Sequence, residues 1–153
     1  MIRYTMVLVA VLAGAGPAAA QVSIAGRWTT DYPTAIRNEN GEETVVTTRR
    51  AVFDLALKGD SVTGTWTLAA DSGGPAATPL AVHGARHGTG YLLQTDPVDR
   101  HISVNGDEST LRMATRYQVE VHGDALAGSS TLFAVDGSME MPDRAFAATR
   151  VKP

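Results

Sequence analysis

The sequence predicts an all-β protein, an antiparallel up-and-down meander barrel of about eight strands that follows an N-terminal signal peptide. The first observation behind this prediction is an internal repeat, because the pattern of residue classes from Phe53 to Thr65 returns from Tyr117 to Ser129. Both copies alternate apolar with polar residues, stop at a Gly-Asp pair and then resume, which is typical of an antiparallel hairpin. The second observation is that apolar residues nowhere keep helical spacing over three turns in residues 21–153.

Residues 1–20 have the composition of a secretory signal peptide. Arg3 supplies a basic tip, an apolar run follows, and Ala18-Ala19-Ala20 offers a small-residue cleavage site. The run is shorter than the roughly 20 residues that a helix needs to cross a bilayer, so it predicts cleavage and no membrane anchor. We therefore expect residues 21–153 to form a single β-barrel domain in the periplasm or outside the cell.

Composition excludes several classes of partner and site. Loss of Arg3 with the leader reduces the 13 Lys and Arg to 12, against 16 Asp and Glu. Nucleic-acid binding needs a concentrated basic stripe, and Arg49-Arg50 is the only adjacent basic pair in the sequence. The chain has no cysteine, which excludes a disulfide scaffold, a thiolate metal site and a lipid-modified N-terminal cysteine.

The expected strands follow from period-two alternation and from the turn residues between them. Residues 33–43 contain Pro33, Asn38, Asn40 and Gly41, so we expect a surface loop there. The strands are expected at about 24–32, 44–57, 61–69, 78–83, 89–95, 101–104, 111–121, 126–135 and 144–151.

With short connections and no helix to cover a sheet, these strands must form two packed sheets or close on themselves. Closure removes the unpaired edges that would otherwise promote aggregation. Two further motifs favour the closed form. Gly26-x-Trp28 opens the first strand, and Ala147-Ala148-Thr149-Arg150 lies in the last one.

This pair of motifs resembles the signature of the calycin barrels, which include lipocalins, fatty-acid-binding proteins and avidins. The resemblance implies that Gly26, Trp28 and Arg150 close one end of the barrel, with the guanidinium on the indole face as a cation–π contact. The Gly-Asp hairpins also resemble small secreted bacterial β-barrel proteins of unassigned activity. Trp28 and Trp66 are the only tryptophans, fewer than avidins use in their pocket, so biotin binding is not carried over.

No catalytic, cofactor or metal site is expected from the sequence. His83, His87, His101 and His122 lie near turns, where solvent-exposed side chains account for them better than zinc or copper ligation. No serine has a histidine in register or a Gly-x-Ser-x-Gly elbow, and no glycine-rich loop opens a helix.

The inward-facing residues remain as candidates for a ligand site, above all Phe53, Trp66, Met113 and Tyr117. In a barrel of about eight strands such residues either fill the interior or leave room for one small ligand. We therefore expect a module that binds an apolar or amphipathic small molecule. A noncatalytic structural or protein-interaction role in the cell envelope is the alternative, and a barrel isomerase or cyclase acting on a hydrophobic substrate is the third hypothesis.

Overall fold

A computed structural model describes residues 22–40, 42–70, 74, 77–104 and 107–153. The expected signal peptide, residues 1–20, lies outside these described residues. Within them, no helix is long and apolar enough to span a bilayer. The regular structure of this part of the chain consists of nine strands: β1 (Gly26–Glu39), β2 (Glu42–Lys58), β3 (Ser61–Leu68), β4 (Leu80–His87), β5 (Gly90–Thr95), β6 (Val98–Val104), β7 (Asp107–His122), β8 (Ala125–Ala134) and β9 (Arg144–Arg150).

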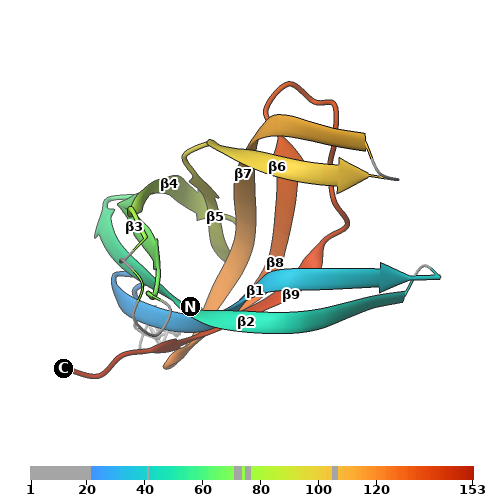
Figure 1. The fold of residues 1–153 in the computed structure, drawn as a ribbon. Helices are drawn as coiled ribbons and strands as arrows, with labels where there is room; N and C mark the ends of the chain where they lie inside the picture. The colour runs from blue at the N-terminus through green and yellow to red at the C-terminus, as the bar shows by residue number, and fades with distance from the viewer. Residues whose placement is uncertain (1–21, 41, 71–73, 75–76, 105–106) are drawn as a thin grey trace, which may run out of the picture.

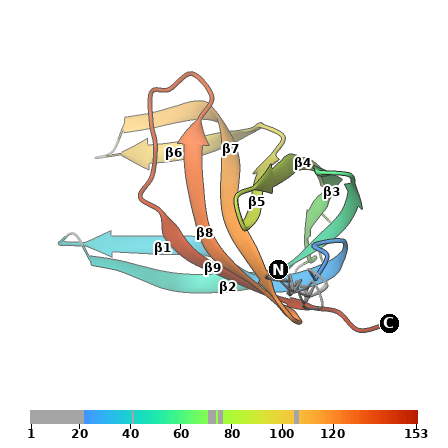
Figure 2. The same ribbon diagram turned by 180° about the vertical axis from the view of Figure 1, so that it is seen from behind.

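Eight of these strands close into an antiparallel barrel. Each strand pairs with its neighbour in the order β1-β2-β3-β4-β5-β7-β8-β9, and β9 returns to pair with β1. The chain thus curls until its first and last strands meet, as the two opposite views in Figures 1 and 2 show. The predicted fold class, an all-β antiparallel up-and-down barrel of eight strands, is confirmed, with β6 as one additional strand.

The ninth strand exists because β7 is long enough to carry two partners on the same edge. β5 pairs with residues 116–119 of β7, and β6 pairs with residues 107–113. The β6–β7 hairpin therefore projects past the barrel wall, above the extended end of β1 and β2 in Figure 1.

The repeat in the sequence corresponds to two hairpins with the same register. β2–β3 turns at Gly59-Asp60, between the paired residues Lys58 and Ser61, and β7–β8 turns at the equivalent Gly-Asp pair. The glycines have φ angles of 61° and 62°, which suits the first central position of a two-residue hairpin loop.

The repeat also places a glycine where the neighbouring strand leaves no room for a side chain. A Cβ on Gly64 would lie 2.0 Å from the carbonyl oxygen of Asp54, and one on Gly128 would lie 1.9 Å from that of Gln118. Each pair occupies the same place in its copy of the repeat. Only glycine fits at these two positions without moving the neighbouring strand.

The expectation of a surface loop at residues 33–43 is wrong. β1 continues to Glu39 and β2 begins at Glu42, so the two strands form an arm that extends beyond the barrel (Figure 1). The register shifts on either side of Ala35, directly after Pro33. A proline has no backbone N–H to donate, and an irregularity on a strand with one free edge tolerates it, which is why the turn-like composition did not end the strand.

The barrel interior is filled by large side chains along most of its length. Trp28, Phe53, Leu93 and Val119 are among its buried members, each at most 1% exposed. The full core cluster is Ile24, Trp28, Ala51, Phe53, Leu55, Val62, Trp66, Val82, Tyr91, Leu93, Tyr117, Val119, Leu126 and Ala148. The core thus lies inside the closed part of the barrel, and space remains where the arm leaves it.

A candidate ligand-binding site at the barrel mouth

The first and last strands meet at a seam held by Arg150. Its guanidinium carbon lies 4.1 Å from the ring centroid of Trp28, and its two terminal nitrogens donate to the carbonyl oxygens of Ala25 and Ser23 at 2.7 and 2.6 Å. The Trp28 indole N–H donates to the carbonyl of Ile24 at 2.8 Å. The structure therefore places a cation–π contact and three hydrogen bonds at one end of the barrel.

Gly26 lies in the same seam. Its φ is 127°, and a Cβ there would lie 2.8 Å from Nη1 of Arg150. A side chain at this position would strain the backbone and push the guanidinium away from its carbonyl partners. Gly26, Trp28 and Arg150 are thus in direct contact at the strand junction.

Beyond this seam β1 separates from β9. The two strands pair only at Trp28 with Arg150 and at Thr29 with Thr149. One step further, the Thr30 hydroxyl donates to the carbonyl of Ala147 at 2.6 Å, so a side chain replaces the backbone ladder. β9 then follows β8 while β1 continues into the arm, and Figure 2 shows the two strands diverging. This separation opens the barrel wall at one end.

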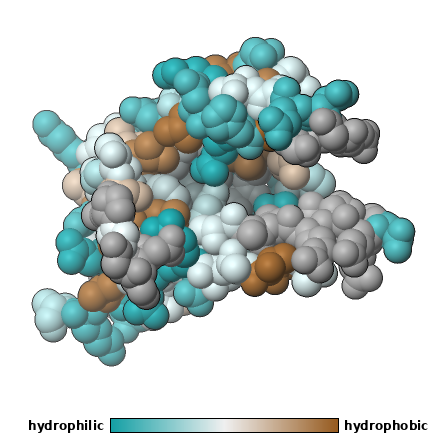
Figure 3. All heavy atoms as spheres, viewed as in Figure 1, coloured by the Kyte–Doolittle hydropathy of each residue, from teal (hydrophilic) through white to brown (hydrophobic). Residues whose placement is uncertain are grey.

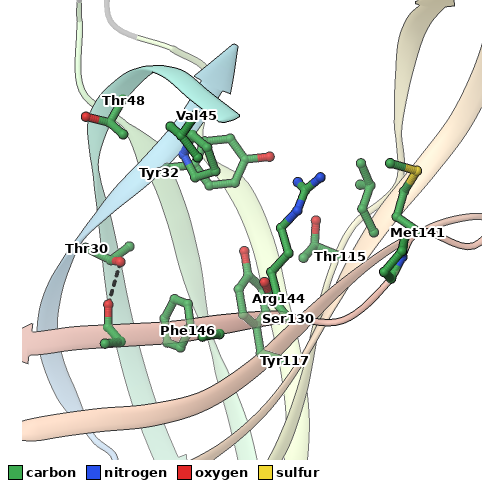
Figure 4. Close-up of a pocket in the computed structure, with 15 residues that line it drawn as sticks. Thr30, Tyr32, Val45, Thr48, Thr115, Tyr117, Ser130, Met141, Arg144 and Phe146 are labelled. Carbon is green, nitrogen blue, oxygen red and sulfur yellow. Dashed lines mark hydrogen bonds between the residues drawn. The ribbon is translucent and has the colours of Figure 1, made fainter. Parts of the chain in front are cut away.

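A pocket of about 320 Å³ occupies the opening, and we call it the mouth pocket. Carbon atoms make up most of its wall. The molecular surface is also hollowed between the β6–β7 hairpin and the arm (Figure 3). The mouth pocket is lined by Thr30, Tyr32, Pro33, Val45, Thr48, Thr115, Tyr117, Ser130, Leu132, Met141, Pro142, Arg144, Ala145, Phe146 and Ala147, most of which are labelled in Figure 4.

A difference between the two copies of the repeat explains why there is room at this place. In the first copy Phe53 pairs with Trp66, and in the second Tyr117 pairs with Ser130. The position that holds an indole in one hairpin holds a hydroxymethyl group in the other. The small Ser130 side chain leaves unfilled the volume that Trp66 fills on the opposite side of the barrel.

The rings of Tyr117 and Phe146 form an apolar wall of the pocket, and the Phe53 ring packs behind them. The ring of Phe146 lies 5.0 Å from that of Tyr117 and 5.8 Å from that of Phe53, and the Phe53 and Tyr117 rings are 5.2 Å apart. All three contacts are edge-to-face, the arrangement that the ring quadrupoles favour. These contacts fix the orientation of the Tyr117 and Phe146 rings in the pocket wall.

The polar groups of the mouth pocket are hydroxyls and one guanidinium. Tyr117, Ser130 and Arg144 lie close together in Figure 4, and Arg144 is the single charged residue among the 15 that line the pocket. Burial raises the pKa of the Tyr117 phenol, and the neighbouring Tyr32 adds to the increase. The phenol therefore stays neutral at ordinary pH and can donate a hydrogen bond. No Asp, Glu or His is among the residues that line the pocket.

A second and much smaller void lies behind Tyr32, and we call it the inner cavity. Its volume is about 10 Å³. Tyr32, Thr115 and Tyr117 line both it and the mouth pocket, so these three side chains form the partition between them. The other residues that line the inner cavity are Trp66, Leu80, Thr95, Val98, Arg100 and Met113.

The four residues expected to contact a ligand lie in the interior, but they do not share one cavity. Tyr117 lines both the mouth pocket and the inner cavity, whereas Trp66 and Met113 line only the inner cavity. Phe53 lines neither void and packs between Tyr117 and Phe146. Contact of these residues with a ligand stays a prediction.

The four histidines lie on the surface, where His83 and His87 line one groove along β4 and β5. His83 lies 3.6 Å from Asp96, His122 lies 3.5 Å from Glu120, and His101 shares a hydrogen bond with Thr110 at 2.9 Å. Among the described residues, no three metal-ligating side chains come together.

Sequence reasoning missed most of the mouth pocket. Strand alternation predicts Tyr32 on the inward face, but it predicts Thr30 and Phe146 only as strand residues and indicates no role for Ser130 beyond a nucleophile without a partner. One signal was present, because extending the repeat by one residue sets Trp66 against Ser130. A large residue facing a small one at the same position indicates a place where the two halves of the interior differ in volume.

No family model, curated protein or solved structure matches this chain. The antiparallel eight-stranded barrel is therefore established by its own strand pairing. Membership of the calycin barrels stays a prediction from the Gly-x-Trp motif and the late arginine.

Proposed function

We propose that this protein is an exported β-barrel that binds a small apolar or amphipathic molecule in the mouth pocket. The single observation that carries the proposal is the concave, mainly apolar pocket of about 320 Å³ at the open end of a filled barrel. Ligand sites in proteins are concave, mostly apolar and about 300–1,000 Å³ in volume, so a ligand here would be at the small end of that range.

The chemistry of the walls supports an amphipathic ligand. Tyr117 and Phe146 offer flat ring surfaces for an apolar body, and Arg144 and Ser130 offer polar contacts for a head group. Binding would be driven by removal of apolar surface from water, and the hydroxyls and guanidinium would orient the ligand. Export is proposed from residues 1–20, and the periplasm or the cell exterior is the proposed location.

The proposal is tested by filling the pocket. Ser130→Trp restores at the second hairpin the indole that the first hairpin carries, and we expect it to occupy the mouth pocket. Ser129→Trp is the matched control, because Ser129 faces the groove on the outer wall between β5, β7 and β8. The fluorescent probe 1-anilinonaphthalene-8-sulfonate should bind the natural chain and Ser129→Trp, and should lose its fluorescence enhancement with Ser130→Trp.

Equal probe binding by both tryptophan variants would show that the mouth pocket is not the site. Near-ultraviolet circular dichroism checks that each variant is folded. If Ser130→Trp does not fold, Ser130→Leu tests the same volume with a smaller side chain. Native mass spectrometry of the protein isolated from its own compartment then tests for a retained small molecule. Apoprotein alone, together with failed probe binding, would refute the proposal.

A further inference from the structure

Two residues that line the inner cavity each have a buried hydrogen-bond donor without a partner. Nε1 of Trp66 and Nε of Arg100 are both inaccessible to solvent and form no hydrogen bond. Trp66 is 6% exposed, so its indole N–H is enclosed by protein. Leaving a buried donor unsatisfied costs about 1–3 kcal/mol, and both residues line the same cavity. An occupant that accepts hydrogen bonds would remove both penalties.

The charge of Arg100 has no carboxylate counterpart in the described part of the chain. Its one hydrogen bond there is from Nη2 to the Tyr32 hydroxyl oxygen, at 3.4 Å. The neighbouring Arg112 differs, because it faces solvent on the outside of the same hairpin, 3.9 Å from Asp99. The Tyr117 phenol cannot supply the missing negative charge, because burial raises its pKa.

The remaining walls of the inner cavity favour an anion over a neutral molecule. Thr95, Thr115 and Tyr117 contribute hydroxyls that can turn their hydrogens inward, and no carboxylate lines the cavity. The Thr95 hydroxyl oxygen already accepts the backbone N–H of Thr115 at 3.0 Å, which directs its own hydrogen elsewhere. Leu80, Val98 and Met113 add apolar surface to the wall, and the lower local dielectric that results strengthens any interaction with the guanidinium.

The size of the cavity limits the occupant. A volume of about 10 Å³ leaves room for one small occupant, which favours a monatomic ion over carboxylates, phosphates and sulfates. We propose that the inner cavity binds a single small monovalent anion of the halide class, held between the indole N–H of Trp66 and Nε–H of Arg100. This site is separate from the mouth pocket and does not depend on the proposed function.

The site has a structural consequence through Tyr32. The Tyr32 ring packs edge-to-face on Trp66 at 5.1 Å, and its hydroxyl is bonded to Arg100. A halide that fixes Trp66 and Arg100 would also fix Tyr32, which forms the partition toward the mouth pocket. Anion binding would therefore order one wall of the mouth pocket.

Nuclear magnetic resonance of the indole N–H groups tests the proposal with a built-in control. The chain has two tryptophans, and the Trp28 indole already donates to Ile24. The full-length mature protein is prepared in methanesulfonate and titrated with chloride at constant ionic strength. We expect the Trp66 signal, assigned by its loss in Trp66→Phe, to shift and saturate while the Trp28 signal stays in place. No shift of the Trp66 signal, or an equal drift of both signals, would overturn the proposal.

Two variants test whether chloride binding needs Arg100 itself or only a positive charge on this hairpin. Arg100→Met should weaken chloride binding by at least about tenfold, since it removes both the charge and a donor. Arg112→Met removes the exposed arginine of the same hairpin and should leave chloride binding unchanged. If Arg100→Met does not fold, crystals of the natural protein soaked in bromide give an independent answer. An anomalous peak between Trp66 and Arg100 supports the site, and a water molecule without anomalous signal refutes it.

Discussion

Replacing Arg150 with methionine tests whether the seam stabilises the barrel. The substitution keeps most of the apolar stem and removes the guanidinium, which makes two hydrogen bonds to carbonyls and stacks on Trp28. Hydrogen bonds from charged groups contribute about 1.5–3 kcal/mol each where they are buried, and a cation–π contact about 0.5–2 kcal/mol. The Arg150 side chain is 21% exposed, and one guanidinium makes all three contacts, so their contributions do not add in full. We expect Arg150→Met to lower the free energy of unfolding by about 2–4 kcal/mol.

The matched control is Arg27→Met on the adjacent face of the same seam. Arg27 lies 3.0 Å from Asp54, but both side chains are more than half exposed, and such surface pairs contribute at most about 1 kcal/mol. Urea unfolding followed by tryptophan fluorescence and far-ultraviolet circular dichroism gives the free energy of unfolding of each variant. Equal losses for the two variants would refute the idea that the Arg150 contacts hold the first strand to the last.

Three further outcomes follow from the geometry. Gly128→Ala should destabilise the barrel by about 1–3 kcal/mol because its Cβ would meet the carbonyl of Gln118, whereas Ala introduced at the exposed Thr63 should change the urea midpoint little. The raised pKa of Tyr117 stabilises the fold fully below the ordinary tyrosine pKa of about 10, and this contribution is lost as pH rises above it. Unfolding measured up to about pH 11 should therefore show a steeper decline for the natural chain than for Tyr117→Phe, and parallel curves would contradict this. Thr30→Val should lower stability by about 1 kcal/mol through loss of the bond to Ala147, and an unchanged thermal midpoint would argue against that bridge.

The fold class was readable from the sequence because strand alternation and turn chemistry are local. The Gly-Asp turns, the hairpins at residues 53–65 and 117–129 and the inward face of β7 all depend on neighbours a few residues apart. The same locality explains the failure at residues 33–43. Pro33 and the asparagines signal a loop, but pairing of β1 with β2 continues past them, with register shifts around Ala35.

The site depended on contacts that no local pattern encodes. Alternation alone placed Phe53, Trp66, Met113 and Tyr117 on the inner face, but it could not show which side chains fill the interior and which leave space. The mouth pocket arises because β9 leaves β1 after Thr29 and because Ser130 stands opposite Tyr117. Both features leave a pocket only because the barrel is closed, and closure brings together strands that are far apart in the sequence.

Local sequence was enough to predict the strands, most of their turns and the buried face of each strand, since these follow from backbone geometry and side-chain polarity over short distances. The position of the pocket, the two donors without partners behind Tyr32 and the length of the arm became visible only in the folded chain. The physical reason is that packing depends on side chains brought together from strands more than one hundred residues apart, such as Thr30 and Ala147.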